Sequence, residues 1–276
     1  MDLLRGLFKS SEKESDNLSF WEHLDLLRNV MIRIGVVVIL SSILGFIFKE
    51  KLFEVILAPH NADFITFRLL SDIILFCGFS PIEHFEIELI NTALAQQFMI
   101  HVKASLCVGI LVASPYIIYE LFRFISPALY AQERKYSVGV ILGGYLMFVF
   151  GLMISYFLIF PLTFRFLATY QVSPTVVNMI SLESYMNTLL MLSLVMGVVF
   201  EIPVVCWLLA KIGILKREFM IHYRRHAIVV ILIIAAVITP TSDFLTLSIV
   251  SLPIYLLYEI SIAIVRRIEI STNKKM

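Results

Sequence analysis

Long apolar runs separated by short polar connections dominate the chain. A hydrocarbon core about 30 Å thick needs about 20 consecutive apolar residues if a helix is to cross it. Five runs reach or approach this length: Val30–Phe48, Leu106–Phe124, Val138–Phe160, Thr188–Ala210 and Phe244–Val265. Because only helices and closed barrels satisfy their backbone inside lipid, the pattern predicts an all-α, polytopic membrane protein.

A sixth apolar run, Ala227–Ile238, is too short for an ordinary span. It would be about 18 Å long as a helix, and length alone would allow a re-entrant or interfacial segment. The basic residues favour a crossing. If the run does cross, only five of the 22 Lys and Arg remain on the outer side, namely Lys49, Lys51, Arg68, Lys103 and Arg165. The other basic residues then share one side with both termini, which the positive-inside rule assigns to the cytoplasm.

We therefore expect six membrane helices in a single integral membrane domain, residues 1–276. A cytoplasmic segment, residues 1–29, precedes the first helix, and two long outer loops cover residues 49–105 and 161–187. The short fifth helix implies local thinning of the bilayer. The mixed polar and apolar segment 85–105 is expected to lie along the outer interface. No apolar core with a small-residue cleavage site occurs near the N-terminus, so the first span would act as its own insertion signal.

Composition and charge exclude several classes of protein. The chain is 59% hydrophobic and 16% charged, against about 45–50% and about 25% in soluble domains. A net charge of +1 is too small for a nucleic-acid-binding protein. Cys77, Cys107 and Cys206 lack metal-ligand spacing and are interpreted as apolar fillers. His222 and His226 are spaced as metal ligands could be, but neighbouring arginines favour a basic helix end. No catalytic motif is present, so no enzyme activity, cofactor or metal is predicted.

Glu201 is the most unusual polar residue, because it lies deep within an apolar run. An ionised group at such a depth costs about 2.5–3.5 kcal/mol on insertion scales. Two interpretations stay open: a protonated carboxyl group that is hydrogen-bonded within the bundle, or a functional polar contact in a groove. Glu120 and Glu259 lie nearer to the ends of spans, where Arg123 and Arg266 are within reach for interfacial ion pairs.

Prolines and glycines predict the shapes of the spans. Pro115, Pro203 and Pro253 lie inside apolar runs, and each is expected to kink its helix. Three kinked helices favour a concave wall over a straight bundle. Gly139 and Gly143 form a GxxxG pattern with Gly144 beside them, which predicts close packing of the third span against a neighbour.

Four stretches of the chain, in order, resemble the TatC family of twin-arginine protein translocases. They are SFWEHLDLLRNVMIR, SPYIIYELFRFISPALYAQERK, FEIPVV and ITPTSDFLTLSIVSLPIYLLYEISI. The resemblance implies a concave, glove-like fold in the bacterial plasma (inner) membrane, with both termini cytoplasmic. It also implies a receptor that binds twin-arginine signal peptides of folded cargo. The implied partners are the single-span subunits TatA and TatB, further copies of the chain and membrane lipid, with transport driven by the proton-motive force.

The resemblance also implies where the signal peptide binds. Carboxylates on the cytoplasmic face would pair with the two guanidinium groups, because such pairing can be bidentate and directional. Glu133 matches the family's loop glutamate. Leu26 stands where the family usually has glutamate in its HLxELRxR motif, so we expect Asp25, with or without Glu22, to replace that carboxylate. Within the same resemblance, Glu201 is a polar site that meets a polar residue of a partner helix. Asp243 matches a family position, but no role is carried over to it.

Two other classes of membrane protein compete with this interpretation. A small transporter or channel would also have several kinked spans and a buried carboxylate, but such folds often show repeated halves, and no internal repeat is found here. An intramembrane enzyme would need a nucleophile–base pair or a metal site. Co-purification of twin-arginine cargo and single-span partners would distinguish a receptor from both.

Overall fold

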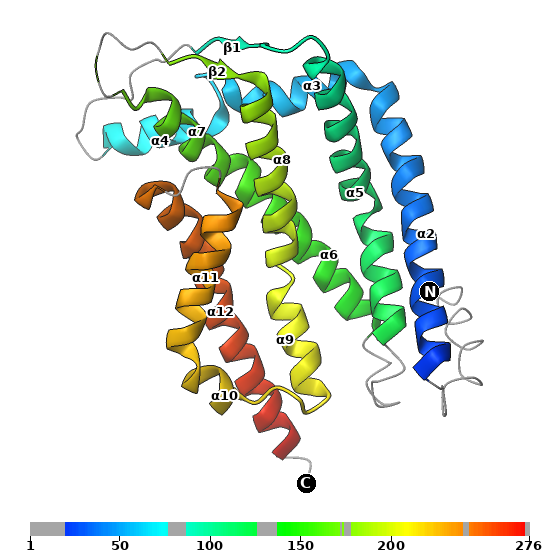
Figure 1. Ribbon diagram of the computed structural model, residues 1–276. Helices are drawn as coiled ribbons and strands as arrows, with labels where there is room; N and C mark the ends of the chain where they lie inside the picture. The colour runs from blue at the N-terminus through cyan, green and yellow to red at the C-terminus, as the bar shows by residue number, and fades with distance from the viewer. Residues whose placement is uncertain are drawn as a thin grey trace.

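The computed structural model of the protein describes residues 20–76, 87–125, 137–171, 173, 178–239 and 243–273. Over these residues the chain is almost entirely helical (Figure 1), as predicted for an all-α protein. Five helical segments are long and apolar enough to cross a membrane: Leu24–Ile47, Gln96–Phe124, Gly139–Thr169, Leu182–Lys211 and Phe244–Ile270. These five contain or overlap the five long apolar runs of the sequence.

Helices α2 (Phe20–Ile47) and α5 (Gln96–Ile125) lie side by side. A Cβ atom added at Gly109 would lie only 2.8 Å from the Cα atom of Ser42, so the two backbones nearly touch at this point and only glycine fits. Pro115 does not end α5. The hydroxyl of Ser114 donates to the carbonyl of Leu111 at 2.7 Å, which satisfies the acceptor that the proline leaves without its usual donor.

The third span consists of three consecutive segments: α6 (Ser137–Ile154), the π-helical segment η4 (Ser155–Ile159) and α7 (Phe160–Thr169). The wider π-turn leaves backbone carbonyls available to other partners. The hydroxyl of Thr66 donates to one of them, the carbonyl of Phe157. A segment from the first long loop is thereby attached to the π-helical segment of this span.

The fourth span is interrupted between α8 (Leu182–Val199) and α9 (Ile202–Lys211). Pro203 occupies the first turn of α9, where proline is tolerated because no N–H group is needed there. It cannot donate to the carbonyl of Val199, so the helix stops and restarts. The predicted effect of Pro203 is confirmed, and the interruption falls on Phe200 and Glu201.

The last part of the chain consists of α10 (Arg217–His222), α11 (Arg224–Ile238) and α12 (Phe244–Asn273). Pro253 lies within α12 without ending it. Helix α11 has 15 residues, which is about 22 Å, and it is not one of the five segments long enough to span. It runs from α10 to the level at which α12 begins (Figure 1). A count of six membrane helices therefore depends on α11 and stays a prediction, as does the side of the membrane on which the ends lie.

The connections at one end of the bundle form what we call the cap. Its elements are α3 (Lys49–Leu57), η1 (Ala58–His60), α4 (Ile65–Phe76), β1 (Leu89–Ile90) and β2 (Ile180–Ser181). The two short strands pair in parallel, with Leu89 opposite Ile180, and so join the two long loops. The opposite end, which carries α10, the start of α2 and the end of α12, is called the base. The segment 85–105 was expected to lie along the interface, but its residues from Gln96 onward are the first turns of α5.

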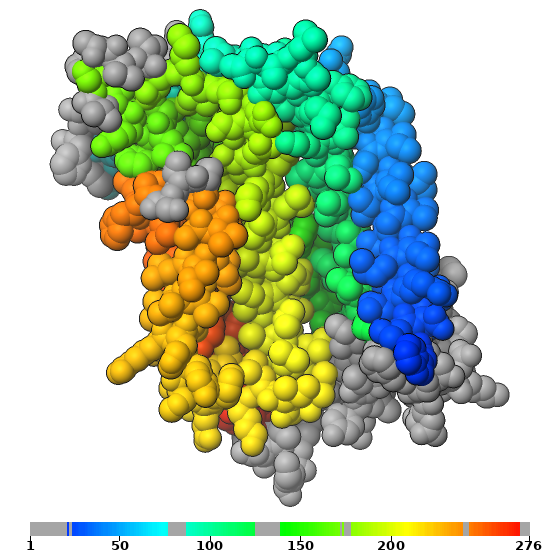
Figure 2. Space-filling model, in the orientation of Figure 1, coloured from blue at the N-terminus to red at the C-terminus, as the bar shows by residue number. Residues whose placement is uncertain are grey.

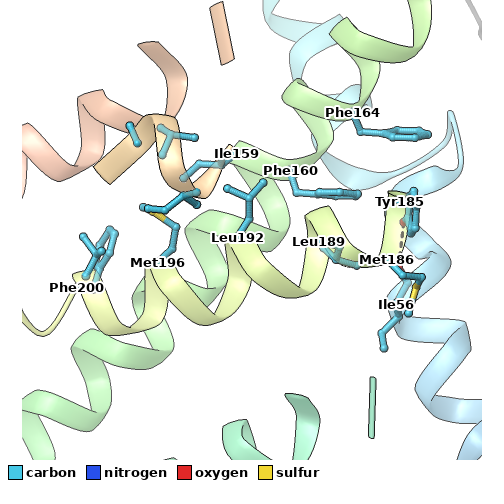
Figure 3. Close-up of a cluster of buried hydrophobic side chains, with 14 of the residues drawn as sticks. Ile56, Ile159, Phe160, Phe164, Tyr185, Met186, Leu189, Leu192, Met196 and Phe200 are labelled. Carbon is cyan, nitrogen blue, oxygen red and sulfur yellow. Dashed lines mark hydrogen bonds between the residues drawn. The ribbon is translucent and has the colours of Figure 1, made fainter. Parts of the chain in front are cut away.

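The largest hydrophobic core lies where α8 crosses η4 and α7, beneath the cap (Figure 3). Leu192 and Met196 of α8 and Ile159 and Phe160 of the third span are fully buried there. The hydroxyl of Tyr185 reaches the carbonyl of Ile56 in α3 at 3.0 Å, so the core and the cap form one unit.

Helices α2 and α11 stand at opposite edges of the molecule (Figure 2). Both expose apolar side chains, among them Val36 and Ile43 on α2 and Val229 and Ile233 on α11. Exposed apolar surface of this extent is expected to face lipid.

The glycine prediction for the third span was wrong for Gly139 and Gly143 but is confirmed for Gly144, where an added Cβ atom would lie 3.1 Å from Glu201 Oε2. Among the described residues, no atom lies within 4 Å of a Cβ atom added at Gly139 or Gly143. The close contact is made by Gly151, where an added Cβ would lie 2.7 Å from the carbonyl oxygen of Met196. The GxxxG spacing thus identified the correct helix but not the face that packs against α8.

Candidate functional site

The first predicted carboxylate, Asp25, lies on α2 at the base. Helix α2 begins ten residues before the apolar run, so Glu22, Asp25 and Leu26 all lie on its first turns. Asp25 Oδ1 is 3.4 Å from Arg28 Nη2, and the two side chains are 67% and 68% exposed. An exposed pair of this kind contributes little to stability, about 0–1 kcal/mol, so the Asp25 carboxylate can exchange its partner. The side chain of Glu22, and all of Glu133, lie outside the described residues.

A second carboxylate, Glu120, is buried between α5 and α2 near the base. Its side chain is 2% exposed, and its Oε1 atom lies 3.7 Å from Arg33 Nη1 and 3.9 Å from Arg123 Nη1. The hydroxyl of Tyr116 donates to the same oxygen at 3.0 Å. The predicted pairing with Arg123 is confirmed. Arg33 and Tyr116 were missed, although an arginine that interrupts the first apolar run was a usable signal.

The third carboxylate, Glu201, lies at the interruption between α8 and α9. An added Cβ atom at Gly144 would lie 3.1 Å from Glu201 Oε2 and 3.4 Å from Ile118 Cγ2. The carboxyl group therefore rests on the bare backbone of α6, next to α5. Its Oε1 atom is buried and has no hydrogen-bond partner in the described part of the chain. This differs from the hydrogen-bonded interpretation, in which the bundle itself would satisfy the carboxyl group.

The remaining polar residues of the last two helices have structural roles. Glu259 was expected to pair with Arg266, but its partner is Arg224: the Nε–Oε1 distance is 2.7 Å and the Nη2 atom donates to Oε2. This two-point pair connects α11 with α12. Asp243 Oδ1 accepts the backbone N–H of Thr246 at 2.8 Å, as a residue that caps the start of α12 does. Within the described ranges, no group of three or more His, Cys, Asp or Glu side chains could hold a metal ion.

Comparison with known proteins identifies the family. The family model described as Sec-independent protein translocase protein (TatC) matches residues 22–253. The chain belongs to the TatC family. A relative with that description from Blattabacterium sp. subsp. Periplaneta americana is 33% identical over 258 residues, which are 92% of this chain and 97% of the relative. The relative from Aquifex aeolicus is 31% identical over 255 residues, 92% of this chain and 96% of its own.

A solved structure supports the same assignment. The crystal structure described as the twin-arginine translocase receptor TatC superimposes with a TM-score of 0.73 at 31% identity, and the match covers 90% of this chain and 100% of that one. As a TatC-family member, the chain is a multi-pass membrane subunit of a protein translocase and not an enzyme. The three carboxylates described above can therefore be considered as sites for binding and for helix packing.

Proposed function

We propose that this chain is the receptor subunit of a twin-arginine translocase in a bacterial plasma membrane. In this role the base faces the cytoplasm and binds the paired arginines of signal peptides on folded proteins. The chain assembles with further copies of itself and with single-span partners of the TatA and TatB type, and the proton-motive force drives export. The solved relative described as a twin-arginine translocase receptor supports this role.

The observation that carries the proposal is the exposure of the Asp25 carboxylate. It is an exposed carboxylate on the first turns of α2, and its partner Arg28 is equally exposed. An incoming guanidinium group can displace Arg28 at little cost, because exposed pairs are weak. Glu120, on the neighbouring helix, is buried and already paired with two arginines. Asp25 is thus the accessible acceptor of the two, and Glu133 and Glu22 complete the proposed site.

The test is photo-crosslinking of a twin-arginine signal peptide to the protein in membranes. A peptide with two lysines in place of the arginines serves as the control for guanidinium recognition. The substitutions Asp25→Asn and Glu133→Gln should each weaken the crosslink, and the double variant should reduce it to the level of the lysine control. Glu22→Gln shows whether that residue contributes. Replacing Asp72, an exposed acid of the cap, with Asn is the matched control and should have no effect.

One outcome would contradict the receptor site: if the double variant retains the crosslink of the parent protein, the carboxylates are not the acceptors. Another would contradict only the assignment of Asp25. If Asp25→Asn has no effect while Glu22→Gln abolishes binding, the replacement for the missing family glutamate is Glu22.

We further propose that Glu201 contacts a polar residue of a partner's single membrane helix. The proposal is supported by the Oε1 atom, which is buried without a hydrogen-bond partner among the described residues. Unsatisfied polar groups in such surroundings cost about 1–3 kcal/mol, and a partner helix that supplies a donor would recover this.

A further inference from the structure

Helix α4 in the cap combines three kinds of surface on 12 residues. Successive residues of a helix are 100° apart, so side chains four apart share a face. Thr66 and Phe67 are buried against the rest of the protein. Arg68 and Asp72, four apart, form an exposed polar strip. Between the polar strip and the buried face lies a third surface, which is both apolar and exposed.

That third surface is a stripe of large apolar side chains at helical spacing. Ile65, Leu69 and Ile73 are 53%, 57% and 59% exposed, and Phe76, which continues the stripe, is 93% exposed. In water, the exposed apolar area of these four side chains would cost about 25 cal/mol per Å². A surface that is apolar on one strip and charged on the next is typical of helices that lie in a membrane interface.

The depth of α4 is fixed by its attachment to η4. Thr66 donates to the carbonyl of Phe157, and the third span begins at Gly139 on the base side. Eighteen residues of helix separate Gly139 from Phe157, which is about 27 Å along the axis. A hydrocarbon core is about 30 Å thick. Because α6 is inclined to α5 and α8 (Figure 1), its rise across the bilayer is smaller than this axial length, and α4 is held on the cap side of the hydrocarbon core.

The direction of α4 agrees with this position. It lies across the direction of α8, at a lower level than β1 and β2 and above the end of α11 (Figure 1). Leu158, in the segment of the third span on which α4 packs, is 48% exposed, so apolar surface continues from the span. Arg165 lies over the ring of Phe67 at 5.9 Å. Arg68 pairs with the exposed Asp63 at 3.9 Å, so charged groups of both signs, which suit the headgroup region, lie at this level.

We propose that α4 is an interfacial helix, whose stripe of Ile65, Leu69, Ile73 and Phe76 is buried in the lipid leaflet on the cap side. The polar strip of Arg68 and Asp72 then faces headgroups and water. The cap is thereby anchored to the bilayer at a second place, besides the spans that it connects. This inference depends on the chain being a membrane protein and not on the proposed receptor role.

The test places a nitroxide label on each of the two exposed surfaces. The protein is reconstituted in vesicles of phosphatidylethanolamine and phosphatidylglycerol, with Cys77, Cys107 and Cys206 replaced by alanine. Leu69→Cys and Ile73→Cys are the test positions, and Arg68→Cys and Asp72→Cys are the matched controls on the same helix. Collisions of the label with oxygen report lipid, and collisions with a water-soluble nickel chelate report water. We expect oxygen collisions to exceed nickel collisions several-fold at the test positions, and the ratio to reverse at the controls.

A second measurement covers the case in which the cysteine-free protein does not fold. Leu69→Trp and Asp72→Trp in the parent background are compared for fluorescence quenching by brominated lipids, after subtraction of the parent signal from Trp21 and Trp207. Quenching should be several-fold greater at position 69. Equal exposure to water at positions 69 and 72 would overturn the proposal. So would a label at position 69 that neither oxygen nor nickel reaches, because protein and not lipid would then cover the stripe.

Discussion

Glu120 and Glu201 both enter the interior of the bundle, and their surroundings differ. Glu120 is the more deeply buried of the two. Its Oε1 atom is surrounded by Arg33, Arg123 and Tyr116. Glu201 is partly buried at the interruption between α8 and α9, where its Oε1 atom has no hydrogen-bond partner in the described part of the chain. Its neighbours there are Gly144 and Ile118.

The comparison separates a structural carboxylate from one that is open to an external partner. A buried ion is tolerated when opposite charge and hydrogen bonds offset its desolvation. The chain supplies that compensation for Glu120, even though its Oε2 atom also lacks a hydrogen bond. It supplies no comparable charge for Glu201 among the described residues. We therefore expect substitutions at the two sites to differ: those around Glu120 should change stability, and those around Glu201 should change association with partners.

The largest effect is expected when both arginines around Glu120 are removed. The double variant Arg33→Gln and Arg123→Gln leaves a buried carboxylate without positive charge. Breaking buried pairs in this way costs about 3–5 kcal/mol, and the lower figure applies because both arginines are 43% exposed. The melting temperature of the purified protein in detergent should fall accordingly.

The control for this prediction is the same double variant combined with Glu120→Gln. Removing the buried charge should restore most of the lost stability, because the loss is caused by the unpaired buried carboxylate and not by the absence of the arginine side chains themselves. A triple variant as unstable as the double one would show that the arginines act through packing alone. That result would contradict the conclusion that Glu120, unlike Glu201, is stabilised by opposite charge.

A smaller effect on stability, but a clear one on assembly, is expected at Glu201. The variant Glu201→Gln should keep its melting temperature, and Glu201→Ala should keep or raise it, because the unsatisfied polar group costs about 1–3 kcal/mol. Association with a TatB-type single-span partner should weaken about tenfold in Glu201→Ala, which corresponds to about 1.4 kcal/mol. Co-purification from membranes measures this. Loss of the folded protein in both variants would favour a structural role like that of Glu120.

The spans were predictable from the sequence because lipid imposes one simple rule, a run of about 20 apolar residues. The rule does not predict how far a helix extends beyond its apolar run into polar surroundings. Helix α2 begins at Phe20 and not at Val30, and α5 begins at Gln96 and not at Leu106. The interruption at Glu201 was also predictable, because Pro203 acts through local backbone chemistry.

Contacts between helices were harder to predict, because they depend on how each helix is rotated. Of the three glycines predicted to pack closely, Gly139 and Gly143 meet no described atom within 4 Å, whereas Gly144 lies on the packed face of α6 together with Gly151. Glu259 had Arg266 within reach on its own helix, yet it pairs with Arg224 from α11. In both cases local spacing identified residues with the required chemistry, and the tertiary arrangement decided which of them meet.

The smallest effect is expected from a single methyl group placed beneath Glu201. In Gly144→Ala the new Cβ atom would lie 3.1 Å from Glu201 Oε2, so the carboxyl group must move by a few tenths of an ångström. A shift of this size should weaken partner association about twofold, which is about 0.4 kcal/mol. Gly143→Ala is the matched control: it lies inside α6 like Gly144, gains the same helix propensity of about 1 kcal/mol, and meets no described atom within 4 Å. In the Glu201→Ala background the effect of Gly144→Ala should disappear, because there is no carboxyl group left to displace. If Gly144→Ala weakens association equally with and without Glu201, the methyl group acts on helix packing, and the open carboxylate is not what the partner recognises.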